Sequence, residues 1–232
     1  METIKKQIIL LALMMSITIT AAAQFNVSYS AGYGTYEMGD MSNMLEQSLS
    51  AIRGQMPDGL KITDNFPGYI THNIDLAYRL NRHEFGLKGS YFSTGGKIAY
   101  ADYSGRYHEK LLLDAYRVGL MYRFHFFKLS NIFSLYGELS PGITFSSLDY
   151  DVLLELPDYE VKETDPGADL GDIKSGYSIL PMIGAQFHPI RHLYFQAAVG
   201  YDVEFGAKLN KNKNLSAEWS GIRLQLGVGL TL

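Results

Sequence analysis

Ten charged residues lie on the polar side of segments in which apolar and polar side chains alternate. Five are acidic and five basic: Asp75, Arg79, Glu84, Lys88, Arg117, Arg123, Glu138, Asp202, Glu204 and Arg223. Unpaired charge is costly to bury, so interiors hold charges by pairing them. A selective channel would instead line its path with charges of one sign. The balanced set therefore predicts a network of ion pairs that fills the lumen of a barrel and carries out no catalysis.

The shortest connection between two alternating segments, residues 81–82, sets the register of the first expected pairs. A hairpin centred there places Arg79 opposite Glu84 and Asp75 opposite Lys88. Opposite charges facing each other across two strands are favourable. A slip of one residue would turn all four charges to the other face.

Two more pairs are expected further along the chain. A turn centred near residues 127–128 would place Arg117 opposite Glu138. Asp202 and Arg223 should lie at similar depth on the last two strands. If Arg117 and Glu138 are partners, removing Glu138 alone should destabilise the protein more than removing both.

Eight segments with a period of two must position these charges. Each has one apolar face and one face of polar residues and glycine: 25–34, 70–80, 84–91, 116–123, 133–145, 177–187, 193–204 and 222–232. Such alternation indicates β-strands. A soluble β-sandwich would alternate in the same way with its apolar faces turned inward. Aromatic residues near the segment ends and charges deep within the polar faces favour a membrane barrel.

The connections between the eight segments alternate between short and long. Short gaps fall at 81–82, 125–131 and 189–192, and long gaps fall at 37–68, 93–110, 146–174 and 206–218. Short periplasmic turns and long outer loops are typical of outer-membrane barrels. We therefore expect an all-β fold, an eight-stranded antiparallel transmembrane β-barrel with up-and-down connections. An even strand number places both termini in the periplasm.

Residues 1–23 have the features of a cleaved export signal, which leaves residues 24–232 as the barrel domain. Lys5 and Lys6 precede an apolar run that ends in three alanines before Gln24. The alternative, a permanent transmembrane anchor, needs about 20 apolar residues, more than this run supplies. The 232-residue chain has no cysteine, which excludes disulfides and a lipid-anchored cysteine. Its net charge of −4 argues against nucleic acid as a partner.

On this alternation, residues 24–232 resemble the small eight-stranded outer-membrane β-barrels, the OmpA/OmpX-like and PorT-like proteins. The segment from Trp219 to Leu232 resembles the C-terminal signal read by the barrel-assembly machinery, although it ends in leucine where phenylalanine is commonest. The resemblance implies a cell outer-membrane protein without cofactors that contacts outer-membrane lipids and lipopolysaccharide. Adhesion, ligand binding through the loops, a structural role and a part in secretion all remain open, as does an extracellular or periplasmic protein partner. Eight strands leave room only for side chains, which disfavours an open porin.

Some barrels of this kind are lipid A-modifying enzymes or proteases, which need a histidine beside serine or aspartate on the outer rim. Four of the six histidines fall at the inner turns: His83, His125, His188 and His192. Only His72 and His108 lie near the outer rim, and neither begins a His-x-Ser pair. We therefore expect a protein that is not an enzyme.

The outer loops offer three further candidate sites. In the first, helically spaced apolar residues from Met41 to Met56 predict a helix, begun by Asp40 or Ser42 and ended by Gly54. Its methionines could bind Cu(I), but an apolar face packed on the barrel mouth is the simpler interpretation. Residues 146–174 are acidic and could bind Ca²⁺, but they lack the spacing of an EF-hand, and a solvated loop is the simpler interpretation.

The loop at residues 93–110 combines aromatic and basic side chains. They are Tyr100, Tyr103, Tyr107, Lys97, Arg106 and Lys110. Such groups could contact lipopolysaccharide phosphates or sugars, or could simply continue the aromatic girdle of the barrel.

Overall fold

The computed structural model describes residues 23–54, 59–103, 105–130, 132–156, 159–165, 174–206 and 216–232. The expected export signal, residues 1–23, lies outside this set apart from Ala23, the first residue of β1. Eight strands form the body of the molecule: β1 Ala23–Gly34, β3 Tyr69–Leu80, β4 His83–Asp102, β5 Gly105–Leu129, β6 Phe133–Leu156, β8 Lys174–Ile190, β9 Leu193–Phe205 and β10 Gly221–Thr231.

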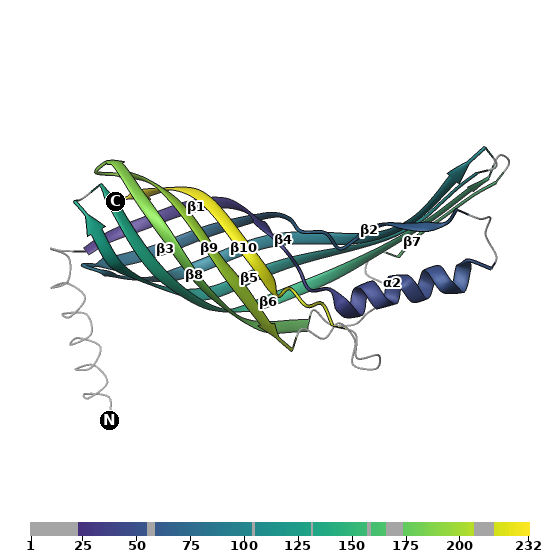
Figure 1. Ribbon diagram of the computed structural model, residues 1–232, viewed down its shortest axis with the longest axis horizontal. Helices are drawn as coiled ribbons and strands as arrows, with labels where there is room; N and C mark the ends of the chain where they lie inside the picture. The colour runs from purple at the N-terminus through teal and green to yellow at the C-terminus, as the bar shows by residue number, and fades with distance from the viewer. Residues whose placement is uncertain are drawn as a thin grey trace, which may run out of the picture.

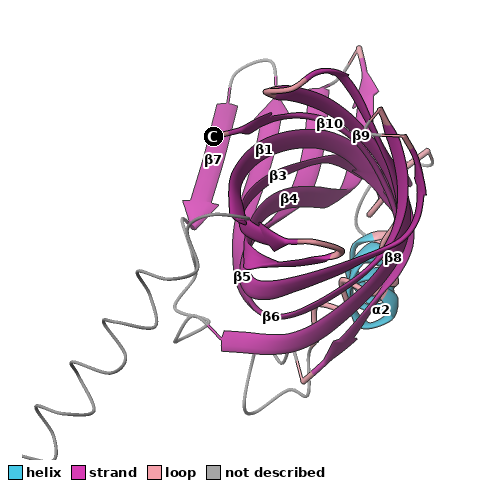
Figure 2. Ribbon diagram, turned by 90° about the vertical axis from the view of Figure 1, so that its left-hand side faces the viewer, coloured by secondary structure: helices cyan, strands magenta, loops and turns pink. Residues whose placement is uncertain are grey.

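These eight strands close into a ring by antiparallel pairing. Neighbours in the ring follow chain order, and β1 pairs with β10 to complete it. Figure 2, a view from one end of the barrel, shows the strands surrounding a central lumen. The up-and-down, eight-stranded barrel expected from the alternation is therefore confirmed.

The two faces of the barrel wall carry opposite kinds of side chain. Ile74, Leu87, Val118 and Leu226 point outward and are 52–70% exposed. Polar residues of the other parity, such as Asp75, point into the lumen and are buried. Rings gather on the outer face toward both ends of the strands, with Phe85 and Tyr122 in tilted contact near the turns and Tyr91 and Tyr116 in tilted contact near the opposite end. This arrangement is the reverse of a soluble β-sandwich.

Three strands continue far past the barrel (Figure 1). The β4–β5 ladder runs without a break from the pair His83–Phe124 to the pair Asp102–Gly105. Two short strands, β2 (Lys61–Asn65) and β7 (Tyr159–Asp165), join the outer parts of β4 and β6. Residues 93–110, expected to be a loop, are thus an extended hairpin. The expectation failed because the alternation continues there with smaller and more polar residues on its outer face.

Helix α2, Gly39–Ile52, packs on the face of this extension that continues the lumen surface. Met41, Leu45 and Leu49 form its buried stripe. The expected caps are wrong: Met38 precedes the helix without a side-chain cap, and Arg53 ends it. Among the described residues, no helix is long and apolar enough to cross a membrane.

We call the part of the fold that extends beyond the barrel the platform. It consists of β2, β7, α2 and residues 93–114 and 147–156 of the long strands. Its core joins α2 to the sheet through fully buried side chains, including Leu45, Ile98, Leu111 and Leu113. Met41 belongs to this core, so the helix face is packed, as the simpler interpretation of the methionines held.

Candidate functional site: the charged lumen

The centre of the lumen is occupied by Arg123, a β5 residue that is 1% exposed. Its Nε lies 2.6 Å from Oε2 of Glu138 on β6, and its Nη2 lies 2.5 Å from Oδ2 of Asp75 on β3. Nη1 lies 3.5 Å from Oε1 of Glu84 on β4. One guanidinium therefore joins carboxylates from three strands, the fork geometry for which arginine is suited.

Lys88 completes what we call the central cluster, made of Asp75, Glu84, Lys88, Arg123 and Glu138. Its Nζ forms an ion pair with Glu138 and lies 3.8 Å from Oδ1 of Asp75. In the β3–β4 ladder Asp75 faces Lys88 and Arg79 faces Glu84, the register expected from the tight turn.

Sequence reasoning missed one member of this region, His125. The sequence pattern places His125 at a turn, but it lies on β5 with its side chain fully buried, and its Nε2 is 3.0 Å from Oε2 of Glu84. Its parity is that of Arg117 and Arg123, so the period-two rule, extended two residues further, would have found it.

A second group, the outer cluster, consists of Arg117, Asp202 and Arg223. Nη2 of Arg117 lies 2.5 Å from Oδ2 of Asp202, and Nη2 of Arg223 lies 3.0 Å from the same oxygen. Asp202 and Arg223 are close in depth, as expected from the last two strands. The expected pairing of Arg117 with Glu138 is wrong, since Arg117 faces Thr144.

The cause of this error is the position of the β5–β6 turn. Strand β5 continues to Leu129, Ser130 takes a positive φ of 61°, and a bulge interrupts the ladder between Phe124 and Phe127. The turn is therefore centred several residues beyond 127–128, and Arg123 takes the place opposite Glu138.

The remaining two predicted residues, Glu204 and Arg79, form no ion pair with either cluster among the described residues. Oε2 of Glu204 accepts a hydrogen bond of 2.9 Å from the backbone N–H of Trp219, and no ion pair of Glu204 occurs among the described residues. Arg79 lies near the turns, and in the described part of the chain its guanidinium hydrogen-bonds only to neutral oxygens, the Asn81 carbonyl and Gln186 Oε1, each at 3.4 Å.

Above the outer cluster, aromatic side chains cover the lumen at the platform end. Trp219 is fully buried, packs edge-on against Phe92 and Tyr36, and donates through Nε1 to Ser146 Oγ at 2.9 Å. The Arg223 guanidinium lies 4.9 Å from the centre of the Tyr36 ring. Trp219 and Phe92 belong to the same apolar cluster as the buried residues of α2, and Tyr36 packs against this cluster. The platform core and the outer end of the lumen are therefore continuous.

Tyrosine fills part of the opposite half of the lumen. The Tyr136 ring lies against Gly184, where an added Cβ would be 2.4 Å from ring Cζ, and Tyr194 lies in the same way against Gly229. Each ring lies over its cross-strand partner on the neighbouring strand, and glycine at that position leaves room for the ring.

The other candidate sites are placed as follows. His72 faces outward and bonds through Nδ1 to the Tyr29 hydroxyl at 2.7 Å, while His108 on the platform lies 3.6 Å from Asp151. In the described part of the chain, no group of three or more histidine or acidic residues could hold a metal ion. Met56 and much of the acidic 146–174 segment, including Asp158, lie outside the described residues.

A closed antiparallel barrel with an apolar exterior, rings toward both ends and a polar, charged lumen defines a transmembrane β-barrel of the outer-membrane type. No protein-family model and no curated protein matches the chain. Its fold is similar to solved outer-membrane proteins at low identity. OprG from Pseudomonas aeruginosa aligns at 12% identity and a TM-score of 0.46, covering 91% of this chain and 96% of that chain. The Neisserial surface protein A aligns at 11% and 0.42, covering 90% and 99%. Ail from Yersinia pestis aligns at 16% and 0.39, covering 90% and 97%.

Proposed function

We propose that this protein is an integral outer-membrane barrel that holds a folded binding platform outside the cell and does not act as an open pore. Both termini would then lie in the periplasm, at the end of the barrel with the short turns. The observation that carries this proposal is the platform itself, whose strands continue those of the barrel and enclose an apolar core with α2.

Two layers of side chains support a closed lumen. The central cluster links β3, β4, β5 and β6 through Arg123, and it mixes both signs of charge. Trp219 and Phe92 form a second, apolar layer toward the platform. An ion path would have to break buried ion pairs at the first layer and pass an aromatic layer at the second.

Lipopolysaccharide is the ligand for which the platform offers the best chemistry. Lys97 on β4 faces Lys110 on β5 and, on its other side, Asp64 on β2, and all three border a cavity of about 310 Å³ that also contacts Tyr69. Like charges directly opposite on two strands repel each other. A phosphate of lipopolysaccharide between the two ammonium groups would remove that repulsion.

A protein partner, as in a PorT-like component of a secretion machine, is the second candidate. Within the described residues, β2 pairs only with β4 and β7 only with β6, so each leaves one strand edge unpaired. Unpaired edges accept an added strand from another chain. Co-purification in mild detergent tests this candidate.

Lipid bilayers test the proposed function directly. The protein should fractionate with outer membranes, migrate faster on an unheated gel than after boiling, and give no large, stable openings in planar bilayers. Lipopolysaccharide-containing nanodiscs should protect Lys97 and Lys110 from amine-reactive labelling, relative to phospholipid nanodiscs, with Lys61, an exposed platform lysine that does not border this cavity, as the control. Ion-selective channels, or equal labelling in both discs, would contradict the corresponding part of the proposal.

A further inference from the structure

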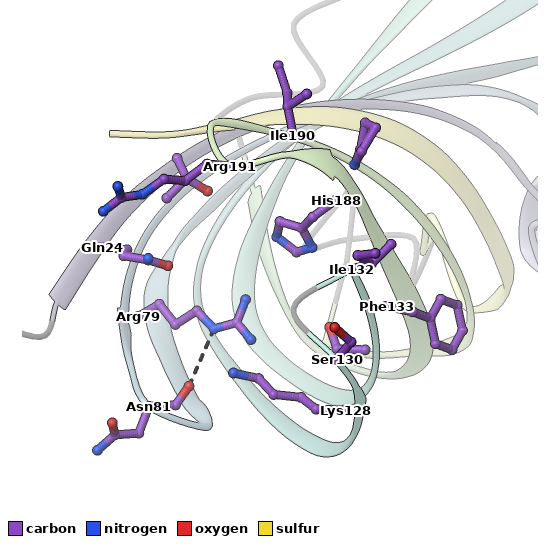
Figure 3. Close-up of a pocket in the computed structure, with 13 residues that line it drawn as sticks. Gln24, Arg79, Asn81, Lys128, Ser130, Ile132, Phe133, His188, Ile190 and Arg191 are labelled. Carbon is purple, nitrogen blue, oxygen red and sulfur yellow. Dashed lines mark hydrogen bonds between the residues drawn. The ribbon is translucent and has the colours of Figure 1, made fainter.

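The lumen opens toward the turns into a cavity of about 620 Å³, which we call the inner cup. Thirteen of the described residues line it, and none of these thirteen is acidic. Three carry basic side chains, Arg79, Lys128 and Arg191, and they come from β3, β5 and the β8–β9 turn. Figure 3 shows Arg79, Lys128 and His188 directed toward the space within the ring.

Arg79 places a buried positive charge at the bottom of the inner cup. It is 7% exposed, yet among the described residues its guanidinium hydrogen-bonds only to neutral oxygens, at the outer limit of hydrogen-bond distance. Its cross-strand neighbour Glu84 attracts Arg79 but forms no ion pair with it in the described part of the chain, because the Glu84 carboxylate is bound by Arg123, His125 and Asn26. A largely buried cation without a carboxylate partner is costly, and an anion in the cup would lower that cost.

Neutral donors add to the positive charge. Ser130, Ser134, Asn81 and Gln24 also line the cup and can donate hydrogen bonds to oxygen atoms. The central cluster lies directly beyond Arg79, deeper in the lumen. Its charged side chains, packed across the lumen, close the deep end of the cup. A ligand can therefore enter only from the end with the turns.

We propose that the inner cup binds an oxyanion with two or more negative charges, either a soluble phosphorylated or polycarboxylate molecule or the phosphate of a lipid headgroup. Arg79 holds the anion at the bottom of the cup, where it is shielded from water. Lys128 and Arg191, which are exposed at the rim, attract it and contact its outer oxygens. The site is separate from the platform and needs only the barrel, so it does not depend on the function proposed above.

Isothermal titration calorimetry on the mature protein in non-ionic detergent tests this site. The probes are pyrophosphate, citrate and dihexanoyl phosphatidic acid, each titrated at low and at moderate salt. At least one should bind, and Arg79→Gln should weaken its binding by about tenfold or more, the usual effect of losing a charge-assisted hydrogen bond. Tighter binding of pyrophosphate or citrate would identify a soluble ligand, and tighter binding of the lipid analogue a headgroup.

Two further variants keep the test decisive. Lys128→Gln, at the exposed rim, leaves the packed lumen intact and should also weaken binding, so a folding defect of Arg79→Gln would not end the experiment. Lys97→Gln removes the same charge from the platform and should bind as the wild type does. Absence of binding by all three probes, or equal loss in Lys97→Gln and Lys128→Gln, would overturn the proposal.

Discussion

Arg123 on β5 and Glu138 on β6 face each other across the strand ladder, with Nε and Oε2 2.6 Å apart. The same guanidinium lies within ion-pair distance of Asp75 and Glu84, so one cation serves three carboxylates. The stability of the lumen therefore depends more on Arg123 than on any other single charge in the central cluster.

Replacing Arg123 by methionine should lower the free energy of unfolding by about 3–5 kcal/mol, because it leaves buried carboxylates without their shared cation. Arg79→Met is the matched control, since Arg79 has no carboxylate partner among the described residues and should cost much less. Urea unfolding in lipid vesicles, followed by the fluorescence of the one tryptophan, Trp219, measures both. Similar losses in the two variants would show that the three-carboxylate arrangement is not what stabilises the lumen.

Trp219→Ala should destabilise the protein by about 3–5 kcal/mol, since it leaves a cavity in the platform core and removes the bond to Ser146. The looser packing of α2 should speed trypsin cleavage after the exposed Arg53 at its end. Trp219→Phe, which keeps most of the volume, should resist trypsin nearly as well as the wild type does. The alanine variant should remain closed in planar bilayers because the central cluster is untouched; stable openings would place the barrier at Trp219 instead.

Tyr36 lies between β1 and α2, outside the membrane-spanning strands, and burial raises its pKa to about 12. In the unfolded chain the Tyr36 hydroxyl ionises near pH 10. The stability contributed by neutral Tyr36 is therefore complete below pH 10 and is lost as pH rises toward 12. Tyr36→Phe should reduce the loss of stability across this range by about 2 kcal/mol. At pH 7 it should be neutral or stabilising, because the buried hydroxyl has no hydrogen-bond partner among the described residues. Equal pH dependence of the two proteins would contradict this assignment.

The orientation of the barrel in the outer membrane can be measured by labelling single introduced cysteines, because the chain itself contains no cysteine. Tyr103, at the tip of the β4–β5 hairpin, is 98% exposed, and Lys128 is exposed at the opposite end. In intact cells, a membrane-impermeant maleimide should label Tyr103→Cys but not Lys128→Cys. Both should react after the outer membrane is permeabilised, and the reverse pattern in intact cells would place the platform in the periplasm.

The sequence predicts the barrel well because its wall has a strict rule: one parity faces lipid and the other faces the lumen. It also predicts the β3–β4 register, because a turn of two residues fixes the hairpin pairing and places Asp75 opposite Lys88. The β5–β6 register was not predictable in this way. Its turn depends on the positive φ of Ser130 and on a bulge, and neither has a glycine or proline to mark it.

The platform and the inner cup could not be predicted from local patterns. The 93–110 segment lacks the strong apolar face of a membrane strand, because its outward side chains meet water and its inward ones pack on a helix from elsewhere in the chain. The cup joins residues from separate turns, and the isolation of Arg79 follows from what Glu84 binds instead. Such properties arise only once distant strands have been brought together.

The unbroken β4–β5 ladder has a mechanical consequence. Its hydrogen bonds run from the turns of the barrel to the hairpin tip without a hinge. The platform is therefore a rigid continuation of the barrel wall and is not joined to it by a linker. A pull on the tip along the strands loads these bonds in parallel, as shear, and no single bond can give way first. With the platform outside the cell, as proposed above, a pull on the hairpin tip would pass along these strands into the ring of eight strands, which would distribute the load.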